Sequence, residues 1–283
     1  MERQHSKTFW RYFKKNRLAD GGLIIVIMIF LIAIFAAALS PYDPGKTDVS
    51  LKLKPPSFRN YLGTDQLGRD VFSRMLHGSR ISLTVGFIAV GISILIGVLV
   101  GATAGYYGSW VDSLLMRFVD TMLCFPSFFL ILTVVALMGP NLINIMIVIG
   151  ITSWMGTARF VRAEFLSLRE RDFAQAARAL GVKDLRIMFR HILPNALAPV
   201  FVTATLSVAS AILVEAGLSF LGFGVQPPAP SWGNILTEGR TYIFDAWWLT
   251  VFPGLAILIT VLSFNLVGEG LRDALDPRLR GRR

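Results

Sequence analysis

The chain has few charged residues, a single cysteine and little histidine. Only 16% of its 283 residues are charged and 54% are hydrophobic, whereas a soluble domain carries roughly 25% charged and 45 to 50% apolar residues. This composition excludes an ordinary soluble domain. Cys124 alone can build neither a disulfide framework nor a thiolate metal site, and the three histidines fall in three separate segments, so no metal site is expected.

Acidic residues are also scarce. The chain has 18 Asp and Glu against 28 Lys and Arg, a net charge of +10. The basic residues lie between apolar runs and do not form one basic domain. They therefore indicate membrane topology, and no nucleic-acid partner is expected.

Long charge-free runs are what the sequence has in abundance. A helix needs about 20 mostly apolar residues to cross a hydrocarbon core about 30 Å thick. Runs of this kind lie at 21–42, 81–111, 121–158, 191–214 and 246–268. As one helix, 121–158 would reach about 57 Å, and a Gly-Pro-Asn turn at 139–141 divides it into two spans. The run 216–237 carries three prolines and four glycines, which predicts a structured loop. The prediction is an all-α polytopic membrane protein with six transmembrane helices.

The distribution of Lys and Arg favours a cytoplasmic location for both termini. With the N-terminus inside, 20 of the 28 basic residues lie on the cytoplasmic side and 8 outside. Seven of those eight fall in the first outer loop, 41–80, which is the least favourable feature of this assignment. A cleaved signal peptide is the alternative for the first span. Its apolar core of about 18 residues exceeds the 7 to 15 of a signal peptide, so an uncleaved anchor is expected.

The second span contains two overlapping GxxxG spacings, formed by Gly97, Gly101 and Gly105. They place a flat stripe on one helix face, where another backbone can approach closely. Packing within the chain is the preferred interpretation, and a subunit interface is the alternative.

The cytoplasmic loop at 161–195 carries its own helix signals. Asp172 with Gln175 three residues later fits an N-cap and its reciprocal partner, and Gly181 fits a left-handed C′ position. Small alanines between them would let this helix enter a groove of another protein. Asp184 is predicted to cap a second helix. The alternative is an amphipathic pair lying on lipid headgroups, and the spacing alone does not decide between the two.

The same loop resembles the EAA loop of binding-protein-dependent ABC importer permeases, through Gln175-Ala176-Ala177, Gly181 and Leu193-Pro194. In that family this loop forms the coupling helix that docks on the ATPase. The resemblance implies the following ATPase-contacting residues: Asp172, Phe173, Gln175, Ala176, Ala177, Arg178, Leu180 and Gly181. Two departures are Gln175 in place of the usual Glu and His191 in place of an aliphatic residue.

Segments at 62–70, 215–224, 230–233 and 271–278 are similar to the dipeptide, oligopeptide and nickel branch of that family, specifically to its C-type permease. The resemblance implies the type I ABC importer permease fold, with residues 1–80 preceding a permease domain at 81–283. It also implies a bacterial cell-membrane location and three kinds of partner: a B-type permease, two ATPase subunits or domains, and an external solute-binding protein. ATP and magnesium would bind the ATPases, so this chain is expected to hold no cofactor and no catalytic residue. Di- and oligopeptides are the expected cargo, with nickel as the alternative.

Five outer residues are candidates for docking the binding protein or for gating: Asp65, Arg69, Asp70, Glu215 and Trp232. For the first three, the alternative is a self-capped loop that leads into a helix beginning near Val71. Glu215, an acid at the end of a span, could face the translocation path. We prefer that it ties the Gly-rich loop through backbone hydrogen bonds. Trp232, with Trp247 and Trp248, first indicates an interfacial aromatic belt.

Three other functions are less well supported. An intramembrane enzyme needs ionisable residues that converge at mid-membrane depth, and the sequence pattern shows no such group. A free-standing channel has no need of a capped docking helix. Gly45-Lys46-Thr47 imitates the end of a phosphate-binding loop, but Ser40 stands where the first glycine belongs, so the match is attributed to chance.

Overall fold

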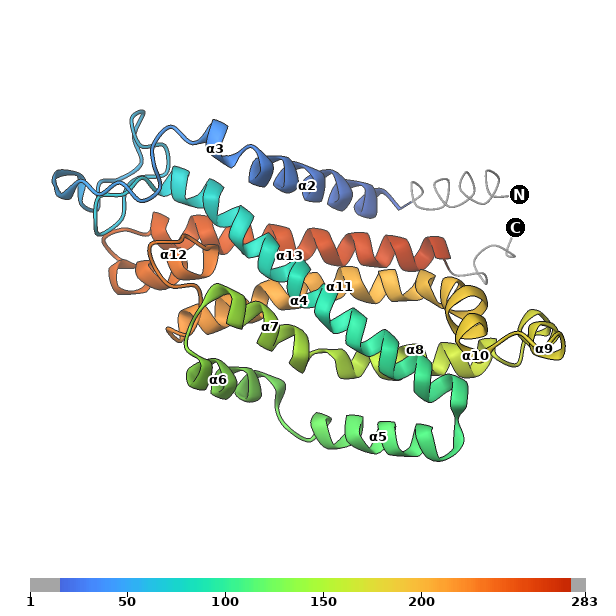
Figure 1. The fold of residues 1–283 in the computed structure, drawn as a ribbon. Coiled ribbons are helices and arrows are strands. Elements are labelled where there is room, and N and C mark those ends of the chain that lie inside the picture. Colours follow the sequence, from blue (N-terminus) through green and yellow to red (C-terminus); the bar gives the residue numbers. More distant parts are fainter. Residues whose placement is uncertain (1–15, 276–283) are drawn as a thin grey trace.

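The computed structural model describes residues 16–275, and all regular elements in that range are helical (Figure 1). The first half contains α2 (Arg17–Ile34), α3 (Ala36–Leu39), the 3-10 turn η1 (Val49–Leu51), α4 (Val71–Tyr107), α5 (Ser109–Leu123), α6 (Ser127–Met138) and α7 (Leu142–Thr152). The second half contains α8 (Trp154–Leu168), α9 (Asp172–Ala179), α10 (Asp184–Arg186), the π-helical turn η2 (Ile187–Ile192), α11 (Leu193–Phe220), α12 (Trp232–Gly239), η3 (Arg240–Tyr242) and α13 (Trp248–Leu275). The predicted cytoplasmic segment before residue 16, the end of the 271–278 segment and His5 lie outside the described residues.

Five helical stretches are long and apolar enough to cross a membrane. They are α2, α4, the pair α7 and α8, the stretch from α10 to α11, and α13. The remaining predicted span, which begins at 121, is not one straight helix. Its two parts, α5 and α6, meet at 81°. Pro126 explains the bend, since it lacks an N–H and keeps the preceding residue out of helical geometry. The predicted break at 139–141 is confirmed, because α6 ends at Met138 and α7 begins at Leu142.

Helix α5 begins 12 residues before the predicted span. The prediction started at 121 because acidic and basic residues earlier in α5 interrupt the charge-free run. Two of these acids pair with arginines of α8, Asp112 with Arg162 and Asp120 with Arg159. The sequence pattern did not predict contacts between these ionisable residues. In the structure they form two ion pairs that hold α5 against α8.

The glycine stripe of α4 packs against α8 within the chain, as predicted. A Cβ added to Gly97 would lie 2.6 Å from the Cβ of Thr157, and one added to Gly101 would lie 2.4 Å from the carbonyl oxygen of Ala158. At Gly105 it would lie 2.6 Å from the Cβ of Phe165. Only glycine permits this close approach along three turns of α4.

The bundle has two distinct ends. The start of α2, the end of α13 and α9 lie at one end, and the loop 41–70 and α12 lie at the other (Figure 1). The side-chain amide of Asn16 donates to Asp273 at 3.3 Å, which joins the two described ends of the chain. This arrangement is the one that an even number of spans requires. Which end faces the cytoplasm remains the prediction from Lys and Arg counts.

Candidate functional site

Helix α9 rests on the rest of the chain through two alanines. Ala174 is 0% exposed and Ala177 is 7% exposed, and both pack in a cluster with Phe165 of α8 and Met188 of η2. The other residues of the predicted ATPase-contacting set are exposed. The prediction that all the alanines let this helix enter a groove of another protein therefore needs correction. Half of them seat α9 on its own chain, and only Ala176 and Ala179 face outward.

The predicted cap at the start of α9 is wrong. Asp172 is already the first helical residue, and its side chain makes no capping hydrogen bond. The amide nitrogen Nε2 of Gln175 instead donates to the carbonyl oxygen of Glu170 at 3.0 Å. Because Asp172 has helical geometry, its carboxylate does not fold back over the first turn, although its charge still suits the positive end of the helix dipole.

The predicted end of α9 is confirmed. Gly181 has φ +74°, a left-handed geometry that costs glycine little. The N–H of Gly181 donates to Arg178 O at 3.0 Å and the N–H of Val182 donates to Ala177 O at 3.1 Å. These two bonds form a Schellman motif, which stops the helix and leaves Leu180 exposed.

The end of α4 anchors this loop. The hydroxyl of Tyr106 donates to Asp184 Oδ1 at 2.6 Å, and the Arg178 guanidinium lies 5.7 Å from the Tyr106 ring centre. Arg169 donates to the carbonyl oxygens of Gly105 and Tyr106 at 3.0 and 3.2 Å, where a cation complements the negative end of the α4 dipole. Asp184 is thus an acceptor for Tyr106 and not the predicted helix cap, since no cap bond is made at α10.

The second predicted loop helix is not a separate element. Beginning at Asp184, α10 continues through η2 into α11 with no loop between them, and Pro194 lies in the first turn of α11. Pro194 lies just after the π-helical turn η2, where the hydrogen-bond pattern of the continuous helix changes, and a proline is tolerated at such an irregularity. Met188 and Ile192 of this stretch are buried, whereas Leu185 and Phe189 are exposed. The second half of the loop 161–195 is therefore the direct N-terminal extension of a candidate span.

At the opposite end, a buried ion network organises the first loop. Asp65 is 0% exposed and accepts from Arg69 Nε at 2.6 Å and from Arg74. Glu238 of α12 also accepts from both arginines, at 3.0 Å from Arg69 and 2.9 Å from Arg74 Nη2. Arg74 and Glu238 were missed by the sequence reasoning, because no local spacing links residues 164 positions apart. This pairing also neutralises two of the basic residues assigned to the outside.

Asp70 caps α4, which begins at Val71 as predicted. Its Oδ2 accepts from the backbone N–H of Ser73 at 2.8 Å, and its Oδ1 accepts from the Asn60 side chain at 2.8 Å. Asp70 is only 4% exposed, as is Arg69. The self-capped loop therefore describes Asp65, Arg69 and Asp70 in this structure. Near them, the Asp48 pKa is lowered by hydrogen bonds from Ser50.

Glu215 ties the Gly-rich loop, but through side chains and not through the predicted backbone bonds. It is 0% exposed, and its Oε1 accepts from the hydroxyls of Ser219 at 2.8 Å and Ser231 at 2.9 Å. Ser231 is in turn the N-cap of α12 in a capping box with Asn234. The carboxylate thus fixes the start of α12 against the end of α11.

Two of the three tryptophans do not form the predicted aromatic belt. Trp232 and Trp248 are 4% and 3% exposed, and their indole N–H groups donate to Met75 O and Thr64 O, both at 3.1 Å. They fasten α12 and α13 to α4 and the first loop. Trp247, 49% exposed, is the one that remains available for an interface. Across residues 16–275, no group of three or more His, Cys, Asp or Glu side chains could hold a metal ion.

The chain matches two family models. Residues 93–281 match the model described as "Binding-protein-dependent transport system inner membrane component", and residues 6–56 match "N-terminal TM domain of oligopeptide transport permease C". A solved structure of the MetNI methionine ABC transporter has a similar fold, with a TM-score of 0.50 and 20% identity, over 71% of this chain and 96% of that chain.

Curated relatives match over almost the full length. The dipeptide transport system permease protein DppC of Alkalihalophilus pseudofirmus is 48% identical over 271 residues, which cover 96% of this chain and 89% of the relative. The di/tripeptide transport system permease protein DppC of Pseudomonas aeruginosa is 47% identical over 280 residues, with 97% and 92% covered. The chain therefore belongs to the family of inner membrane components of binding-protein-dependent transport systems.

Proposed function

We propose that this chain is the permease subunit of an ATP-driven importer of di- and oligopeptides, in which separate ATPase subunits dock on α9. The names of the relatives, which concern dipeptides and di/tripeptides, support peptides over nickel as the cargo. The observation that carries the proposal is the construction of α9. Its back is seated by Ala174 and Ala177, and its outer face is exposed.

This construction suits the transmission of force. An ATPase that moves α9 also moves Tyr106 at the end of α4, through Arg178 and Asp184. The same loop continues into α11 without a break. Closure of an ATPase dimer would therefore reach two spans at once, and those spans would exchange an outward for an inward opening as a two-state element.

The remaining partners follow from this assignment. A B-type permease supplies the other half of the pathway, ATP and magnesium bind on the ATPases, and a solute-binding protein delivers cargo from outside. The α9 end and both termini face the cytoplasm of a bacterial cell. Residues 1–80 form an N-terminal segment, and residues 81–283 form the permease domain. These points rest on the resemblance and on the Lys and Arg distribution.

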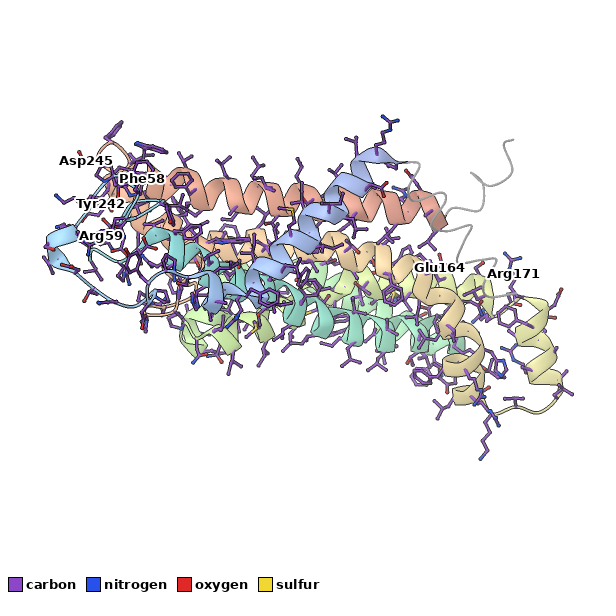
Figure 2. The ribbon with its side chains drawn as sticks, turned by 90° about the horizontal axis from the view of Figure 1, so that it is seen from above. Phe58, Arg59, Glu164, Arg171, Tyr242 and Asp245 are labelled. Carbon is purple, nitrogen blue, oxygen red and sulfur yellow. The ribbon has the colours of Figure 1, made fainter. Side chains whose placement is uncertain are left out.

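The binding protein docks, in this proposal, on exposed side chains at the end opposite α9. Phe58 is 100% exposed and Phe244 is 98% exposed. Figure 2 shows Phe58 and Arg59 at this end together with Asp245, far from Glu164 and Arg171 at the α9 end. The buried Asp65, Arg69 and Asp70 would then shape the docking surface from beneath, and Glu215 and Trp232 would hold α12.

An outward-facing charge on α9 tests the assignment without disturbing the fold. Ala176→Glu places a carboxylate at an exposed position, so the chain folds, but docking would bury an unpaired charge. We expect loss of ATPase association and of dipeptide uptake in proteoliposomes. Thr47→Glu, at an exposed position of the loop 41–70 at the other end, is the control and keeps both activities. Normal association and uptake by the Ala176→Glu complex would contradict the proposal.

A further inference from the structure

A cavity of about 210 Å³ lies between α4, α7 and α11. Four serines line it: Ser93 of α4, Ser153 at the junction of α7 and α8, and Ser207 and Ser210 of α11. The rest of its wall is apolar and comes from the same three helices. Four hydroxyl groups therefore face one space inside otherwise apolar spans.

Three of these four hydroxyls form no hydrogen bond within their own helices. Elsewhere in the spans, Thr84, Thr133 and Ser263 donate to the carbonyl of the residue four positions earlier, at 2.7 to 2.8 Å. Within residues 16–275, the hydroxyls of Ser93 and Ser153 make no hydrogen bond, and neither does that of Ser207.

Ser93 is the most informative of the four, because only 3% of it is exposed. Its hydroxyl faces the cavity, where it has no protein partner and can bond only to water or to another polar occupant. Ser210, by comparison, has only a long contact of 3.5 Å with Leu206 O. Apart from this contact, the wall offers hydroxyl donors and acceptors that nothing in the described chain uses.

The serines lie near the middle of their spans. Ser93 is four residues from the midpoint of α4, Ser153 is two residues from the midpoint of 142–168, and Ser207 is five residues from the midpoint of 184–220. At 1.5 Å per residue, each is within about 8 Å of the centre of its span. Ser153 also stands where α7 ends and α8 begins, and no side chain caps the first turn of α8. The start of a helix carries partial positive charge, which favours carbonyl or carboxylate oxygens.

We propose that this cavity is a cargo-contact site inside the translocation pathway, and that it takes the main-chain amide or terminal carboxylate groups of a short peptide. The inference rests on the proposed function. Hydroxyls both donate and accept, so they can recognise a peptide main chain whatever its side chains. Neutral hydroxyls are poor ligands for a nickel ion, for which imidazole is better suited. A drug-sized ligand needs a pocket of roughly 300 to 1,000 Å³, so the cavity holds only part of a peptide at a time.

Thiol labelling provides a test that does not depend on transport rates. The chain has one cysteine, Cys124, which is exposed and lies outside the cavity. In a Cys124→Ser background, Ser153→Cys should react with a water-soluble maleimide in the assembled transporter. Tri-alanine delivered by the binding protein should slow that reaction about tenfold, whereas it should leave labelling of the native Cys124 in the wild-type complex unchanged. Equal rates for Ser153→Cys with and without tri-alanine would overturn the proposed site.

A transport assay separates the site from the proposed function. Ser93→Ala combined with Ser207→Ala removes two hydroxyls, and each hydrogen bond is worth several-fold. Tri-alanine uptake should fall about tenfold, while binding-protein-stimulated ATP hydrolysis changes less than twofold. Ser263→Ala, whose hydroxyl bonds to its own helix, is the control and keeps both. Uptake by the double variant within twofold of wild type overturns the site, whereas absence of uptake by the wild-type complex overturns the proposed function itself.

Discussion

Leu180, at the end of α9, provides a quantitative test of the coupling surface. Its side chain is 83% exposed, and the Schellman turn at Gly181 holds it outward. Fully burying a leucine is worth about 1.5 to 3 kcal/mol. An ATPase that covers the exposed part would therefore gain up to about 2 kcal/mol. Leu180→Ala removes most of this apolar surface, so we expect a loss of about 1.5 kcal/mol, or roughly tenfold in Kd.

The assay is direct binding of the purified ATPase to the permease in nanodiscs. Leu95→Ala is the matched control, because Leu95 is 62% exposed on the side of α4, within a candidate span. Both substitutions remove an exposed side chain, so neither should lower the unfolding temperature by more than a few degrees. We expect weaker ATPase binding from Leu180→Ala alone.

Two results would refute this reasoning. A Kd for Leu180→Ala within twofold of wild type would mean that the ATPase does not cover this part of α9. An equal loss from Leu95→Ala would mean that leucine removal weakens binding through the lipid environment, and not through α9.

Three further predictions concern the fold. Gly101→Ala should destabilise the bundle by about 1 to 3 kcal/mol in thermal unfolding, because the added Cβ would clash with a backbone oxygen of α8. Gly91→Ala adds its Cβ in open space and should leave the stability unchanged. Equal stabilities of the two variants would contradict the α4–α8 packing. Glu238→Gln should lower the free energy of unfolding by about 3 kcal/mol, because it breaks a buried ion pair. Asp120→Asn, in an exposed pair, should lower it by less than about 1 kcal/mol. The reverse order would argue against the buried network. Gly181→Ala should accelerate hydrogen exchange in α9, since alanine at φ +74° costs about 1 kcal/mol; unchanged exchange would mean that α9 ends by another mechanism.

Local signals predicted the elements well. Apolar runs gave five of the spans, the Gly-Pro-Asn turn located the break before α7, and the start of α4 at Val71 followed from Asp70. Gly181 ended α9 as expected. Each of these depends on residues within a few positions of one another, and therefore on helix periodicity, turn geometry and capping.

The failures share a different cause. Asp172 has the right residue type for a cap, but the backbone at Arg171 already places it inside the helix. The bend between α5 and α6 was missed because Pro126 lies inside the charge-free run 121–158, and apolar length alone does not reveal a bend there. Gln175 donates an amide hydrogen to Glu170 O, which a glutamate could not do, so the departure from the usual residue has a structural role of its own.

The sequence by itself determined that the chain spans a membrane as helices, where α4 begins, where α9 and the break before α7 lie, and which loop resembles a coupling helix. Apolar length and local turn chemistry suffice for that. Only the tertiary structure decided which distant residues meet. Arg74 finds Glu238 across 164 positions, and Ser93 shares a cavity with Ser153 and Ser207. Many arginines and serines have suitable chemistry, and helix packing alone selects which of them become neighbours.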